Sequence, residues 1–184
     1  MILPEVQVLL ERARSARLSL DGLLDVLPAD YWSRAAPGSR WDVRDQLAHV
    51  ASADDLLHDL LRTVAAGHET AWLGGTHDPA ELLAFCEAPL TTFAGLPLEA
   101  LRSRSDEARA AVESTLPSLD LWMLEANVSI AGAVDRWGEP LRWGLRAYLA
   151  TWAHHDSAHE ADIRAAIATT PDLSTVALTQ RRRR

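Results

Sequence analysis

The sequence contains no lysine, since all 18 of its basic residues are arginine. It has one cysteine, Cys86, which excludes an internal disulfide and fits a reducing compartment. No apolar run reaches the roughly 18 residues of a membrane span, and the N-terminus lacks the charged, apolar and small-residue regions of a signal peptide. We therefore expect a cytoplasmic protein that does not enter the membrane.

The chain also has little positive charge outside its last residues. Its formal net charge is −8, and residues 181–184 are four arginines, which leaves −12 for the rest. An acidic body repels phosphate backbones, so nucleic acid is excluded as a partner of the folded part. A length of 184 residues suits one domain. We expect that domain over residues 1–176, followed by an arginine-rich, disordered tail over residues 177–184.

Apolar residues recur at helical spacing in four long segments, which predicts an all-α fold. The expected long helices cover residues 4–27, 42–66, 97–116 and 141–168, with a short helical piece over residues 79–86. Asp42 is a suitable N-cap for the second of these helices, with Asp45 at the capping-box position. Residues 117–140 fit an irregular connection, a short helix or a pair of short extended pieces. Four long helices joined by loops are typical of a four-helix bundle.

The segment WAHHDSAHEADI carries three of the seven histidines. At about 100° per residue, His159 lies about 40° from His155, and both fall on the apolar side of the predicted helix. His154 lies about 100° the other way and is expected to face solvent. Histidines four residues apart can bring two imidazoles to one metal ion, or they can be core histidines with satisfied hydrogen bonds. Because buried polar rings without partners are costly, the apolar position favours a metal site.

A third ligand is expected from another helix, and His49 in DVRDQLAHVASADDLL is the best candidate. It falls on the apolar side of the predicted second helix, although a single histidine there is more often a core residue. The other histidines are expected away from the site: His58, His68 and His77. Three protein ligands with open positions are typical of catalytic metal sites. Asp156 and Glu160 could support the ligands, but salt-bridged surface carboxylates are the simpler interpretation.

Two segments resemble the DinB/YfiT-like superfamily, which includes thiol-dependent maleylpyruvate isomerases and bacillithiol and mycothiol S-transferases. RWDVRDQLAHVASAD is similar to the family's tryptophan-to-histidine segment and gives His49 as a ligand. YLATWAHHDSAHEADI is similar to the family's His-Asp-x-x-His ending and gives His155 and His159. Many members carry a second histidine where this chain has Ala158, a position that is not a ligand. The resemblance implies a DinB-like four-helix bundle over nearly the whole chain.

The resemblance also implies a divalent metal ion, variously zinc, nickel, iron or manganese. In the enzymatic members a low-molecular-weight thiol, such as bacillithiol or mycothiol, coordinates the metal, loses its proton and attacks a small electrophile. The function expected here is therefore a metal-dependent thiol S-transferase. Metal-dependent hydrolysis and a non-catalytic, stress-related metal-binding bundle stay open as alternatives, because residues 70–140 carry no recognised substrate motif. Relatives often form homodimers, and exposed tryptophans within residues 122–143 would support one.

Overall fold

The computed structural model describes residues 2–168, except for the side chains at positions 83, 85–87, 89–90, 93–94 and 140. The predicted arginine-rich tail lies outside the described residues. The described chain contains seven α-helices: α1 (Pro4–Asp25), α2 (Val43–Ala65), α3 (Pro79–Ala94), α4 (Leu98–Thr115), α5 (Leu121–Leu124), α6 (Leu145–Trp152) and α7 (His155–Ala168). None of the helices within residues 2–168 has both the length and the apolar character that a membrane span needs.

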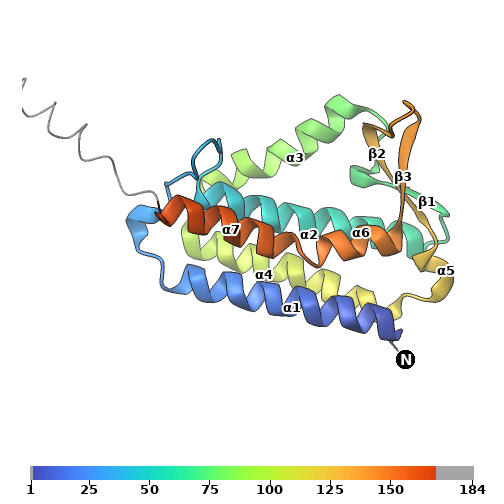
Figure 1. Cartoon of the computed structure of the whole chain (residues 1–184), viewed down its shortest axis with the longest axis horizontal. Coiled ribbons are helices and arrows are strands. Elements are labelled where there is room, and N and C mark those ends of the chain that lie inside the picture. The colour runs from blue at the N-terminus through green and yellow to red at the C-terminus, as the bar shows by residue number, and fades with distance from the viewer. Residues whose placement is uncertain (1, 169–184) are drawn as a thin grey trace, which may run out of the picture.

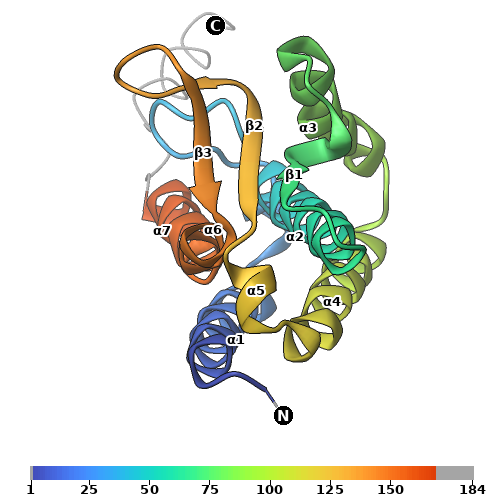
Figure 2. The ribbon, with the colours of Figure 1, turned by 90° about the vertical axis from the view of Figure 1, so that its right-hand side faces the viewer.

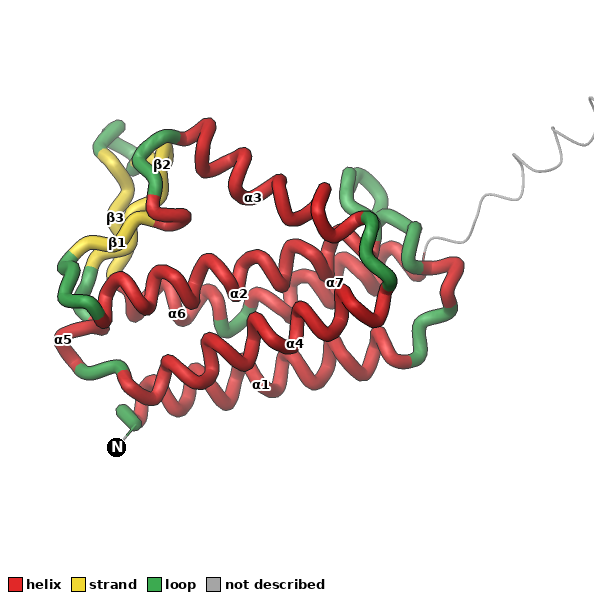
Figure 3. Tube along the Cα trace, turned by 180° about the vertical axis from the view of Figure 1, so that it is seen from behind, coloured by secondary structure: helices red, strands yellow, loops and turns green. Residues whose placement is uncertain are grey.

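Four helical rods lie side by side along the long axis of the molecule: α1, α2, α4 and the pair α6–α7 (Figure 1). Among the helices, the most extensive contacts join α2 to α4 and α1 to α7. Helix α3 crosses above α2, as the view from behind also shows (Figure 3). The predicted cap of α2 is confirmed: the Asp45 N–H donates to Asp42 Oδ1 at 2.9 Å, and the Asp42 N–H donates to Asp45 Oδ2 at 3.3 Å.

The fold is mostly helical but not all-α, and that part of the sequence prediction is wrong. A three-stranded sheet with the order β1-β2-β3 stands at one end of the helical rods, on the same side as α3 (Figure 2). Its strands are β1 (Thr70–Trp72), β2 (Asn127–Val134) and β3 (Pro140–Gly144). Strand β1 is parallel to β2, and β2 is antiparallel to β3. The segment 117–140 thus contains both a short helix, α5, and extended structure.

The last predicted helix also differs from the structure. Residues 141–144 belong to β3, which pairs with β2, and do not extend the helix. Over four residues an apolar pattern cannot separate a strand from a helix, so the sequence could not show this. A turn at Ala153 and His154 then divides the rest into α6 and α7. Helix α3 runs to Ala94, which is longer than the short piece expected over residues 79–86.

The core consists of two apolar clusters separated along the helices by a polar layer. One cluster contains Val6, Leu57, Leu61 and Val112, and the other contains Leu20, Leu47, Leu101 and Ile163. Between them, each helical rod contributes at least one buried polar or charged residue: Arg17, Asp54, Ser105, Arg109 and Asp156. We call Arg17, Asp54, Arg109 and Asp156 the ion cluster. The ion cluster lies next to the candidate metal ligands, because Asp156 directly follows His155 at the start of α7.

Candidate metal centre

The structure brings together the three histidines selected from the sequence, His49, His155 and His159, which we call the triad. His49 comes from the second turn of α2, His155 is the first residue of α7, and His159 lies one turn further along α7. Their candidate ligand nitrogens all lie within 4.8 Å of one another. The Nε2 atoms of His155 and His159 are 3.1 Å apart. The ring centroid of His49 is 5.2 Å from that of His155 and 5.0 Å from that of His159.

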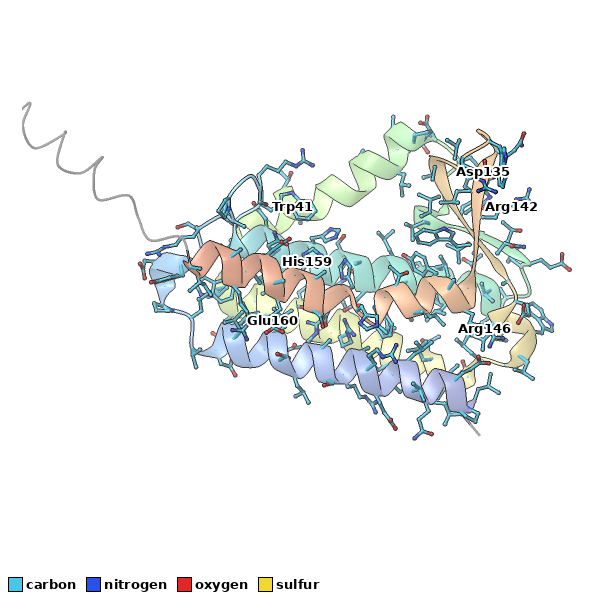
Figure 4. All side chains as sticks on the ribbon, in the orientation of Figure 1. Trp41, Asp135, Arg142, Arg146, His159 and Glu160 are labelled. Atoms are coloured by element: carbon cyan, nitrogen blue, oxygen red, sulfur yellow. The ribbon has the colours of Figure 1, made fainter. Side chains whose placement is uncertain are left out.

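Two further residues, Trp41 and Gln46, contact this group, and Gln46 was not selected from the sequence as part of the site. The Trp41 ring packs on His49 with centroids 4.6 Å apart and lies 6.4 Å from His159 (Figure 4). The Trp41 N–H donates to Ser39 Oγ at 3.1 Å, which fixes the backbone just before α2. Gln46, buried on α2, pairs its Oε1 with Nδ1 of His159. The triad therefore has an aromatic wall on one side and a polar partner on another.

The remaining histidines do not join the triad. His154 is exposed, as expected, and its Nε2 lies 3.3 Å from an Arg12 nitrogen. His68 and His77 are also exposed, and the His77 ring packs against Trp72 with centroids 4.1 Å apart. His58 is half-buried on α2 but lies outside the three-histidine group.

The three site histidines are poor bases in this environment. Burial lowers the pKa of each to about 4, from an ordinary 6.5. The neighbouring imidazoles add to this lowering, and the guanidinium groups of Arg109 and Arg17 further lower the pKa of His155. At pH 7 all three rings are therefore neutral, the state in which an imidazole can bind a metal ion.

This electrostatic setting predicts how stability depends on pH. The pKa of each site histidine is lower in the folded chain than the ordinary value of 6.5, so the unfolded chain binds more protons between pH 6.5 and about 4. As the pH falls through that window, the metal-free protein should lose about 1.4 kcal/mol per pH unit for each proton taken up on unfolding. Urea denaturation at several pH values measures this slope. It should become shallower in His49→Ala and stay unchanged in His154→Ala, and equal slopes in all three proteins would contradict the prediction.

The ion cluster lies beside the triad. Asp156 directly follows His155 in the chain, and Arg17 and Arg109 lie close enough to His155 to affect its pKa. Arg17 donates from Nε to Asp156 and from Nη2 to Asp54, both at 2.9 Å. Arg109 donates from Nε to Asp54 at 3.0 Å and from Nη2 to Asp156 at 2.9 Å. All four residues are at least 94% buried. Two positive and two negative charges thus form a closed, neutral arrangement inside the protein.

This arrangement corrects the surface interpretation of Asp156. Only 1% of Asp156 is exposed, and it directly follows His155 in the first turn of α7. Its two guanidinium partners hold the start of α7 against α1 and α4, and so they hold the backbone that carries His155. Glu160 is salt-bridged as expected, because it pairs with Arg164 at 2.6 Å, but its side chain is only 12% exposed and does not lie freely on the surface.

A comparison with protein families matches most of the chain. The model described as the mycothiol maleylpyruvate isomerase N-terminal domain matches residues 13–164. The chain belongs to this family. The resemblance to the DinB/YfiT-like superfamily is thereby confirmed, since the mycothiol-dependent maleylpyruvate isomerase is one of its members. A search of curated proteins finds no match.

Among solved structures, the chain is similar to a crystal structure of the mycothiol-dependent maleylpyruvate isomerase in which one residue has been replaced. The TM-score is 0.66 at 16% sequence identity, and the match covers 88% of this chain. At that identity the likeness shows the fold alone. The match covers 61% of the isomerase chain, so the chain spans less than two thirds of that relative.

Proposed function

We propose that the chain binds a divalent metal ion through His49, His155 and His159, and that it uses the ion to activate a low-molecular-weight thiol toward a small electrophile. The observation that carries this proposal is the convergence of three neutral imidazoles from two helices. The family supports the thiol, because the similar crystal structure is that of a mycothiol-dependent enzyme. We propose mycothiol or bacillithiol as the thiol and a thiol S-transferase as the activity.

The donor set fits a transition metal. Three imidazole nitrogens suit zinc, nickel or iron better than magnesium or calcium, which prefer oxygen ligands. The 3.1 Å between the Nε2 atoms of His155 and His159 suits two nitrogens that share one ion at about 2.0–2.1 Å each. A bound ion would lower the pKa of a thiol beside it, so that the thiolate forms near neutral pH.

The chain's own residues then have separate tasks. The three imidazoles would hold the ion without cancelling its charge, which would leave a positive centre for an anionic sulfur. The Trp41 ring covers one side of His49. In the proposed reaction the thiol S–H bond breaks and an S–C bond to the electrophile forms. The proton goes to solvent when a leaving group departs, or to the adduct when the thiol adds across a double bond.

The finer assignments of fold and partners belong to the same proposal. We interpret the four helical rods as a DinB-like four-helix bundle within a domain over residues 1–176. A homodimer stays a prediction, supported by the exposure of Trp122 (49%) and Trp137 (71%). The proposed partners are the thiol and the electrophile, with no nucleic acid among them.

Metal analysis tests the proposal directly. Mass spectrometry of the purified wild-type protein should find about one transition-metal ion per chain. The His155→Ala, His159→Ala double variant should retain almost none, because a single remaining histidine binds such an ion weakly. His154→Ala, which changes the neighbouring exposed histidine, should keep the wild-type content. A wild-type protein without metal, even after zinc or nickel is added, would show that these histidines are core residues and would end the proposal.

A further inference from the structure

We infer that Gln46 is a positioning residue that fixes the tautomer of His159, so that His155 is the histidine of this pair that must change tautomer when a metal ion binds. The inference deepens the proposed function: the role of Gln46 in metal binding rests on that proposal. The tautomers themselves can be observed in the metal-free protein.

The first step concerns His159. Gln46 is 3% exposed and lies on α2, three residues before His49. Its Oε1 is within hydrogen-bond distance of Nδ1 of His159. A carboxamide oxygen only accepts hydrogen bonds, so Nδ1 of His159 must carry the hydrogen. In a neutral imidazole the other nitrogen, Nε2, then has a free lone pair.

The second step concerns His155. Its Nε2 lies 3.1 Å from Nε2 of His159, at hydrogen-bond distance. Because Nε2 of His159 can only accept, Nε2 of His155 must donate, and His155 carries its hydrogen on that atom. Both Nε2 atoms can become ligands only if His155 gives up this hydrogen. One proton leaves Nε2 and one returns from water to Nδ1, so the ring stays neutral and no net proton is released.

Because Gln46 lies close to the proposed metal site, it matters that the hydrogen-bond acceptor of His159 is uncharged. The same helix, α2, supplies one ligand, His49, and orients another ligand on α7. A glutamate at this position would also accept from Nδ1, but it would bring a negative charge beside the ion. Glutamine orients the ring without that charge, which leaves the centre more attractive to a thiolate.

Nitrogen-15 NMR of the imidazole rings tests the tautomers, with each signal assigned by single histidine variants. In the metal-free protein at pH 7, His159 should be protonated on Nδ1 and His155 on Nε2. After zinc is added, His155 should be protonated on Nδ1 while His159 is unchanged. A metal-free protein with the hydrogen of His159 on Nε2 would overturn the inference.

Metal affinity tests the positioning role with matched variants. In Gln46→Met the affinity for zinc, measured by competition with a chelator, should fall about 10- to 100-fold. Gln46→Glu keeps the acceptor and should bind zinc at least as tightly as the wild type. Gln7→Met should change nothing, because the side chain of Gln7 is exposed and donates to Glu11. Equal losses in Gln46→Met and Gln46→Glu would mean that Gln46 acts through packing alone, which overturns the inference. If the wild-type protein binds no zinc, the proposed function fails, while the NMR result still decides the tautomers.

Discussion

Replacement of Asp54 by alanine should lower the free energy of unfolding by about 3–5 kcal/mol, because it breaks a buried ion pair and leaves its partners unpaired. Asp54 is 1% exposed and accepts from Arg17, Arg109 and Nε1 of Trp152, the last at 2.8 Å. Without it, two buried guanidinium groups face the single carboxylate of Asp156. The excess positive charge has no access to water, and the missing side chain also leaves a cavity.

Urea denaturation of the metal-free protein at pH 7 measures this effect. The neighbouring residue provides a matched control, because Asp55 also pairs with an arginine, Arg104, but its side chain is 33% exposed. Asp55→Ala should cost no more than about 1 kcal/mol, as is usual for solvated pairs. Equal losses for Asp54→Ala and Asp55→Ala would show that the ion cluster contributes no more to stability than a surface pair.

Replacement of His49 by alanine should reduce thiol conjugation to the rate measured without protein. His49 is the one triad member that comes from α2, and two histidines from α7 alone would hold the ion weakly. The measurement is the metal-dependent conjugation of mycothiol with a chromogenic electrophile. The His154→Ala variant should keep the wild-type rate, since His154 lies outside the triad.

The same assay separates the alternative functions. A wild-type protein stripped with a chelator should be inactive and should recover when metal is returned. Bound metal together with ester cleavage but no conjugation would favour a metal-dependent hydrolase. Bound metal with neither activity would favour a metal-binding bundle without catalysis. Conjugation that survives both chelation and the His49→Ala change would contradict the proposed site.

The histidine triad could be found from the sequence because its signal is local. His155 and His159 are four residues apart on an apolar face, and His49 lies on the apolar face of another helix. The turn at Ala153 and His154 does not disturb this argument, because it precedes both ligands of α7. Helical spacing therefore placed both rings on one side, even though the predicted helix was too long.

The sheet and the ion cluster could not be found in this way, since both depend on pairing across the chain. Strand β3 has five residues, and what makes it a strand is its pairing with β2. Arg17 and Asp156 are 139 positions apart, so the local sequence of each shows a charged residue without its partner. The sequence did contain one indication of the ion cluster. Arg17 lies four residues after Ala13 and three before Leu20, on the face of the first helix that is expected to be buried. Charges at such positions on several helices indicate a buried cluster.

The break between α6 and α7 has a consequence for how such a protein can diverge. In a continuous helix, one inserted residue rotates everything beyond it by about 100°. Here the turn at Ala153 and His154 can absorb such a change, while Arg17 and Arg109 hold Asp156 and the start of α7 in place. The sheet can therefore gain or lose residues in evolution while the ligands keep their direction. The end of the molecule that carries the sheet is free to acquire new shapes around an unchanged set of histidines.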